Sequence, residues 1–231
     1  TTERRGVPFA FLFRHSAETK MSFFLSDSAI GISMWTILLS LLECTTVTLF
    51  FIGCVYYVRV AKKKGSRLSA ALASVSTALA FIGGFPNALD KISRTLFSYD
   101  LWFNSTWMFF FVGISYISLF VSALCLNKKT KGTPLLSVVP AFHKPMKYVS
   151  MLFAAVGMTG FYITMFINAR RVMGRYALLY LVTFLAPAFL VVFSAVGSFT
   201  TVWPNIIAQI VNSAGYAALI IANKKLLEKT A

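Results

Sequence analysis

The chain has 231 residues, 58% of them hydrophobic, and its 22 basic residues against 7 acidic ones give a formal net charge of +15. Uninterrupted apolar runs of roughly 20 residues, the length a helix needs to cross a bilayer, exclude an ordinary soluble domain. Because most of the basic residues fall before, between or after these runs, the positive charge indicates membrane lipids, anionic ones in particular, rather than nucleic acid as partner.

Residues 1–28 form a basic segment before the first long apolar run, with several phenylalanines among the charges. Its apolar stretch is too short and too broken for a signal peptide. We therefore expect an extramembrane segment that lies partly along the membrane interface. The basic start and the basic balance favour an organellar protein, with the mitochondrial inner membrane as the expected location.

Residues 29–231 contain six long apolar stretches, which predict an all-α, polytopic transmembrane bundle. The predicted spans are Met34–Val60, Leu68–Ala88, Leu101–Leu126, Tyr148–Ala169, Tyr176–Val196 and Val202–Ala222. The order of span, basic loop, span, neutral loop, span and basic tail occurs twice. The chain therefore divides into two possible three-helix halves, residues 29–130 and 145–231.

The basic clusters conflict with the rule that positively charged loops share one side of a membrane. If six spans alternate in direction, the clusters at residues 59–67 and 127–147 face one side, and those at 170–175 and the C-terminus face the other. A seventh crossing would remove the conflict, but residues 132–142 are too short to span and contain two prolines. We keep six spans and accept the conflict.

The second and third spans differ in side-chain size. The second is rich in small residues such as Ala73 and Ala78, which let helices approach closely in lipid, so we expect it inside the bundle. Pro86 should end it. The third, Leu101–Leu126, carries aromatic side chains around its circumference, so we expect it at the periphery, against lipid or another membrane subunit.

Glu43 is an acidic residue deep inside a predicted span, where a charge costs at least about 2.5 kcal/mol. Polar residues of the sixth span recur at offsets that place them on one face of a helix. This polar stripe consists of Asn205, Gln209, Asn212 and Tyr216. We expect Glu43 to point into the bundle and contact the stripe, either as a packing contact between helices or as part of a solute or proton site.

Motifs for catalysis, metal binding or cofactor binding are missing from the sequence. Cys44, Cys54 and Cys125 lie in apolar runs without a CxxC pair. His15 and His143 fall outside the predicted spans, and no lysine falls inside one. We therefore expect no metal, haem or retinal, and no enzymatic activity.

Two functions remain. The first is a non-catalytic, lipid-contacting subunit that takes part in the assembly of a larger membrane complex, with partner subunits against the aromatic third helix. The second is a small-solute or ion transporter, or a channel, with a site around Glu43 and the polar stripe. The candidate contacts to anionic lipid headgroups are Lys62, Lys63, Lys64, Arg170 and Arg171.

Overall fold

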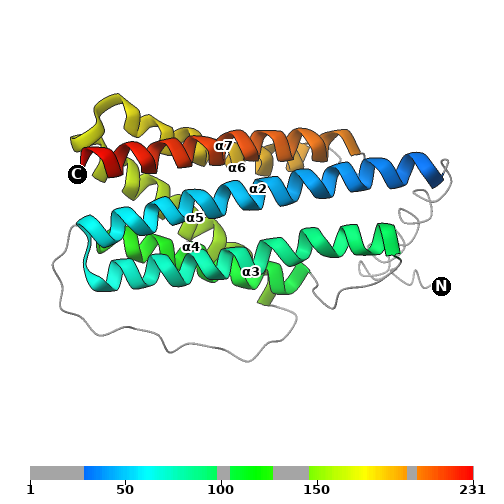
Figure 1. Ribbon diagram of the computed structural model, residues 1–231, viewed down its shortest axis with the longest axis horizontal. Coiled ribbons are helices and arrows are strands. Elements are labelled where there is room, and N and C mark those ends of the chain that lie inside the picture. Colours follow the sequence, from blue (N-terminus) through cyan, green and yellow to red (C-terminus); the bar gives the residue numbers. More distant parts are fainter. Residues whose placement is uncertain (1–28, 98–104, 127–145, 197–201, 231) are drawn as a thin grey trace, which may run out of the picture.

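The computed structural model describes residues 29–97, 105–126, 146–196 and 202–230, and these form long helices that run side by side (Figure 1). The helices are α2 (Ala29–Lys64), α3 (Arg67–Phe97), α4 (Ser105–Leu124), α5 (Met146–Met173), α6 (Leu178–Val196) and α7 (Val202–Lys229), and a short 3₁₀ turn, η1 (Gly174–Ala177), joins α5 to α6. No strand occurs among the described residues, so the predicted all-α class is confirmed. The N-terminal segment 1–28 lies outside the described residues.

Five helical segments in the described part of the chain are long and apolar enough to cross a membrane. They are Met34–Lys64, Arg67–Arg94, Trp107–Leu124, Val149–Ala188 and Pro204–Lys229. The chain is therefore a multi-pass membrane protein, and the prediction of six spans is an overcount by one. The fourth segment joins two predicted spans, because α5 leads through η1 directly into α6. Gly174, with φ of +57°, lets the chain turn there, so that α6 comes back alongside α7.

The helices form a closed ring in which each contacts the next along the chain and α7 contacts α2. Neighbours in a bundle usually run in opposite directions, but α4 and α5 run in the same direction. Gly113 of α4 lies against the backbone of Ser150, and Gly157 of α5 lies against the backbone of Tyr116 and Ile117. Since the residue numbers of the contacting residues rise together along both helices, the two helices are parallel. Both glycines sit against neighbouring backbone, so this pair is closely packed.

The second parallel pair is α2 with α7. Thr46 of α2 lies beside Ser213 of α7, and Gly53, further along α2, lies against Leu219. The ring therefore consists of two three-helix units, α2–α4 and α5–α7, which point in the same direction and meet at these two parallel pairs. Whether the units arose by duplication stays a prediction.

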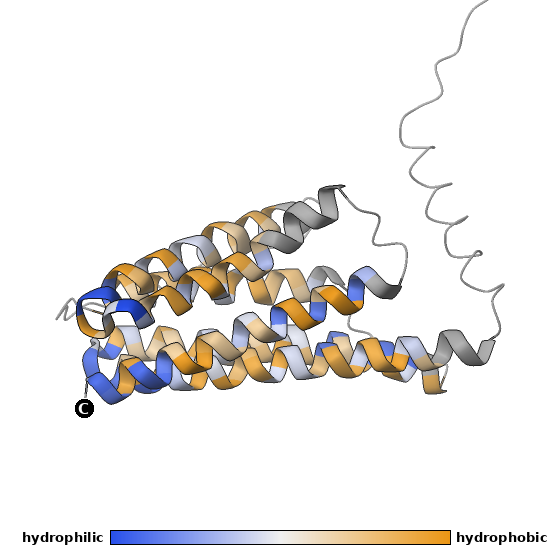
Figure 2. Cartoon of the chain, turned by 90° about the horizontal axis from the view of Figure 1, so that it is seen from above, coloured by the Kyte–Doolittle hydropathy of each residue, from blue (hydrophilic) through white to orange (hydrophobic). Residues whose placement is uncertain are grey.

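This arrangement removes the expected conflict for the basic clusters that the structure describes. Lys62–Lys64 end α2, Arg170 and Arg171 end α5, and Lys224 with Lys225 lies near the end of α7. Because α2, α5 and α7 run in the same direction, these residues gather at one end of the bundle, the basic end, which is blue in Figure 2. The expectation that they face opposite sides is wrong, since it assumed that α4 and α5 alternate. Residues 127–145 lie outside the described residues, and with them most of the predicted basic cluster at 127–147.

Helix α3 does not end at Pro86, as the sequence predicted, but continues to Phe97. A proline inside a membrane helix removes one backbone hydrogen bond, and neighbouring helices make that loss tolerable. The expected contrast between a central α3 and a peripheral α4 is also absent, because each contacts two neighbouring helices. Leu119 of α4 is as fully buried as Ala73 of α3, whereas Ala78 is exposed.

Buried serines join α3 to α4 in two reciprocal pairs. The Ser76 hydroxyl donates to the Ser115 carbonyl over 2.7 Å, and the Ser115 hydroxyl donates to the Ser76 carbonyl over 3.0 Å. Ser69 and Ser122 repeat this exchange two turns away, over 2.9 and 2.8 Å. Small side chains that bond to the opposite backbone hold the two helices close together.

Candidate functional site

One face of α2 points into the bundle. Phe50 lies with its ring centroid 5.4 Å from Tyr116 of α4 and 4.8 Å from Tyr216 of α7. Tyr57, about two turns further on, bonds to Ser122 of α4 and is fully buried. Glu43 precedes Phe50 by the same spacing and therefore shares this inward face. Along the bundle, it lies further from the basic end than Phe50 does.

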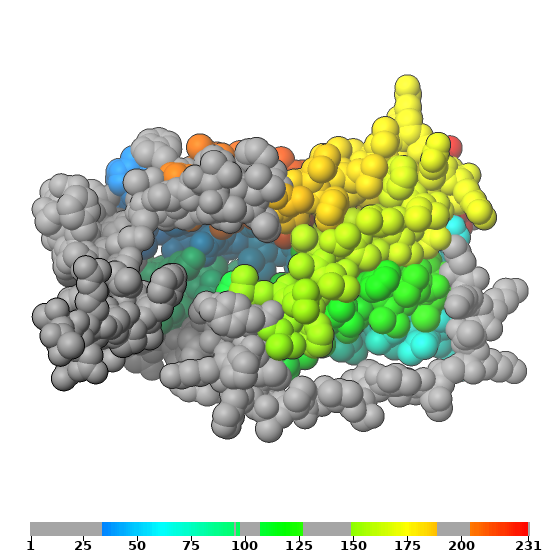
Figure 3. Space-filling model, turned by 180° about the vertical axis from the view of Figure 1, so that it is seen from behind, coloured from blue at the N-terminus to red at the C-terminus, as the bar shows by residue number. Residues whose placement is uncertain are grey.

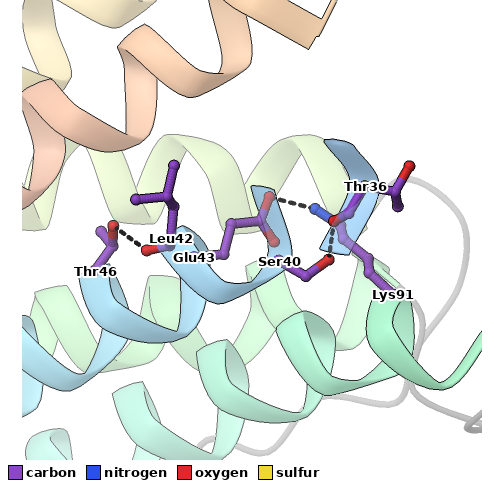
Figure 4. Close-up of polar contacts among 6 residues, drawn as sticks. All are labelled: Thr36, Ser40, Leu42, Glu43, Thr46 and Lys91. Atoms are coloured by element: carbon purple, nitrogen blue, oxygen red, sulfur yellow. Dashed lines mark hydrogen bonds and ion pairs between the residues drawn. The ribbon is translucent and has the colours of Figure 1, made fainter. Parts of the chain in front are cut away.

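Glu43 forms an ion pair with Lys91 of α3, as Figure 4 shows. The Lys91 ammonium donates to the carboxylate over 2.5 Å. The exposed fractions of the two side chains are 14% for Glu43 and 40% for Lys91, so the carboxylate is the more buried partner. A buried carboxylate is costly without such a partner, so Lys91 supplies the contact that Glu43 requires at this depth.

The prediction placed the partner of Glu43 on the α7 stripe rather than on α3. It missed Lys91 because it ended the helix at Pro86 and assigned the following residues to a loop, and for the same reason it found no lysine within a span. Asp90 and Arg94, an ion pair of 2.8 Å at helical spacing, were the sequence signal that the helix continues.

The polar stripe of α7 lies one turn of α2 away from the ion pair. The Thr46 hydroxyl is 2.9 Å from that of Ser213 and 3.4 Å from the backbone carbonyl of Gln209. Asn205 and Asn212 are half-buried. The side-chain oxygen of Asn212 is buried without a hydrogen-bond partner among the described residues. The stripe therefore joins α7 to α2, and its Asn212 oxygen lacks a partner in the described part of the chain.

Three tyrosines from three helices meet beside Phe50. The hydroxyls of Tyr116 and Tyr216 lie 3.3 Å apart. Tyr162 of α5 is fully buried, and its hydroxyl lies close to that of Tyr116 without the distance and angles of an ordinary hydrogen bond to any described residue. We call Phe50, Tyr116, Tyr162 and Tyr216 the aromatic floor. The sequence analysis identified only Tyr216, because the other tyrosines lie on other helices and show no shared spacing.

On the side of the aromatic floor that faces away from the basic end, the helices move apart. The helices converge at the basic end and splay apart toward the other end (Figure 2). Figure 3 shows a hollow beside α5, with α2 visible in blue behind it. Glu43 and Thr46 of α2 and Asn212 of α7 belong to this half of the bundle, and the buried rings of the aromatic floor lie between them and the packed basic end. We call this space the axial chamber.

The predicted lipid contacts lie at the other end of the molecule. Lys62, Lys63, Arg170 and Arg171 are exposed at the basic end, and Lys64 is half-buried. Their position fits contact with headgroups of one leaflet.

In the described part of the chain, no three side chains of the kinds that bind metals lie close enough to hold an ion. Comparisons with protein families, curated proteins and solved structures gave no match. A proposal for the function therefore depends on the arrangement of the ion pair, the polar stripe and the aromatic floor.

Proposed function

We propose that this protein is a small-solute transporter, not an enzyme, and that its site is the axial chamber. The observation that supports this best is the arrangement of two parallel three-helix units, with Glu43, Thr46 and Asn212 in the splayed half of the bundle and the aromatic floor between them and the basic end. Some transporters consist of two parallel repeats related by an axis along the membrane normal, with the solute site at the repeat interface near mid-membrane. The chamber lies at such an interface.

The residues of the chamber suit a path for polar solutes. Lipid would penalise Glu43, Thr46 and Asn212 if they faced outward, so their inward position favours a space that water or solute enters. The aromatic floor below them separates this space from the basic end. A transporter needs such a barrier on one side of its site while the other side is open.

The proposal can be tested by chemical labelling in membranes. In a variant with Cys44, Cys54 and Cys125 replaced by serine, Asn212→Cys should react with a membrane-impermeant maleimide added on the side opposite the basic end. Ile210→Cys, in the same helix but 55% exposed on the outer surface, is the matched control and should stay unlabelled in lipid. No reaction at position 212 from either side would contradict an accessible chamber.

The alternative, a non-catalytic subunit of a larger membrane complex, stays a prediction, as do the mitochondrial inner membrane and the anionic lipid partners. Phe109, Phe110 and Phe111 of α4 are half-buried, which leaves part of this aromatic surface for a partner subunit. Native mass measurement after extraction in a mild detergent separates the two functions. A monomer or small homo-oligomer supports the transporter, whereas a stable high-mass complex of several proteins supports the subunit.

A further inference from the structure

We propose that the aromatic floor and Asn212 select an uncharged solute that carries several hydroxyl groups. This inference rests on the proposed transport function and adds the chemical class of the solute. It follows from the unpaired Tyr162 hydroxyl in the floor and the unpaired Asn212 oxygen one turn of α7 before Tyr216, from the rings of the floor and from the distribution of charge along α2.

The unpaired atoms are a donor and an acceptor. The Tyr162 hydroxyl can donate, and the Asn212 side-chain oxygen can accept, and neither has a partner within the described residues. A buried polar atom without a partner is costly, and most such atoms in folded proteins are paired. A solute hydroxyl both donates and accepts, so hydroxyl groups of one solute could satisfy both atoms.

The rings supply the apolar part of the site. Phe50 contacts Tyr116 and Tyr216 at centroid distances of 5.4 and 4.8 Å, and Tyr162 is buried next to them. Aromatic faces pack against C–H groups, while the tyrosine hydroxyls bond to polar groups at the ring edge. A compact carbon skeleton with hydroxyl groups offers both kinds of surface.

The charges argue against an ionic solute. Among the described residues, the charges nearest along α2 to Phe50 are Glu43 and Arg59, and neither belongs to the floor. Glu43 is already neutralised by Lys91. An ion moved to the floor would lose its hydration without meeting an opposite charge, which is costly in a low-dielectric interior.

The test uses the full chain in proteoliposomes and measures the uptake of radiolabelled solutes. The uncharged probes are a hexose and glycerol, and the charged probes are lactate, lysine and phosphate. We expect uptake of the uncharged probes above protein-free liposomes and no uptake of the charged ones. Tyr162→Phe, which removes only the unpaired donor, should raise KM by about fivefold, as expected for one lost hydrogen bond.

Tyr180→Phe is the matched control, since the Tyr180 hydroxyl already donates to Asn223 over 2.7 Å below the floor. It should lower thermal stability and leave KM unchanged. If Tyr162→Phe does not fold, as judged by size-exclusion chromatography, Asn212→Leu removes the unpaired acceptor instead, with the same expected rise in KM.

The outcomes separate the two proposals. Uptake of a charged probe alone overturns the inference and leaves transport standing. Uptake of the uncharged probes with an unchanged KM in the folded site variant also overturns it. No uptake of any probe counts against the transport function itself, and the inference falls with it.

Discussion

At the scale of single residues, Glu43 shows how a carboxylate is kept at membrane depth. No basic residue of α2 lies within two turns of Glu43, and the lysine that pairs with it comes from α3. The two partners differ in exposure, with the carboxylate more buried than the ammonium. Loss of the Lys91 charge and loss of the Glu43 charge should therefore lower the stability of the protein by different amounts.

We predict that Lys91→Gln destabilises the protein more than Glu43→Gln. Removal of Lys91 leaves a largely buried carboxylate without its cation, whereas removal of Glu43 leaves an ammonium that still reaches solvent. Since Lys91 is partly exposed, the expected loss for Lys91→Gln is about 1–2 kcal/mol, below that for a fully buried pair. Thermal unfolding of each variant in detergent measures this difference.

The double variant, Glu43→Gln with Lys91→Gln, should be more stable than Lys91→Gln alone. Lys225→Gln is the control, because Lys225 and Glu228 form an exposed pair, and its melting temperature should stay close to that of the unmodified protein. Equal melting temperatures for all single variants would show that the pair does not matter for stability.

At the scale of helices, close approach between small residues determines how the bundle packs. The buried serine pairs of α3 and α4 recur at a spacing of about two turns, so one stripe of α3 faces α4 throughout. Ala73 lies between Ser69 and Ser76 in the sequence and is fully buried, whereas Ala78 is exposed on the outer surface. The small residues of α3 are therefore not equivalent, although the sequence analysis treated them alike.

We predict that Ala73→Leu destabilises the bundle by about 1–3 kcal/mol, because the added atoms have no space between packed helices. Ala78→Leu, in the same helix, should cost little, since its side chain faces lipid. The yield of monodisperse protein and its melting temperature check this contrast. Similar losses for both variants would mean that Ala78 is also buried, in a contact outside this chain.

At the scale of the whole molecule, the parallel direction of the two three-helix units places every described basic cluster at one end. Of the described acidic residues, Glu228 is the one in that region, close to the end of α7. Glu43, Asp90, Lys91 and Arg94, which lie toward the other end, balance one another. The charge asymmetry should orient the protein in a membrane with its basic end on the side that holds positive loops.

We predict that single cysteines at Lys63, Arg171 and Lys224 react with an impermeant reagent from the same side of the membrane. The background again lacks the native cysteines. An alternating arrangement of six spans would instead place position 171 on the side opposite to position 63. Labelling of Arg171→Cys from that opposite side would therefore contradict parallel units.

By itself, the sequence determined the class of the fold and the depth of Glu43. Both are local properties, since the length of an apolar run decides whether a helix can cross a bilayer, and the position of an acid within the run gives its depth. Local rules failed at Pro86, because α3 continues past this proline where neighbouring helices pack against it. The predicted helix end therefore left Lys91 outside the span.

Only the tertiary structure decided the direction of α5, the partner of Glu43 and the meeting of Tyr116, Tyr162 and Tyr216. These features depend on contacts between helices far apart in the chain, such as Gly157 against Tyr116 and Lys91 against Glu43. Hydropathy reports how deep a residue lies but not which helix stands beside it. Close packing of glycine and serine against neighbouring backbone determines the neighbours, and with them the chamber.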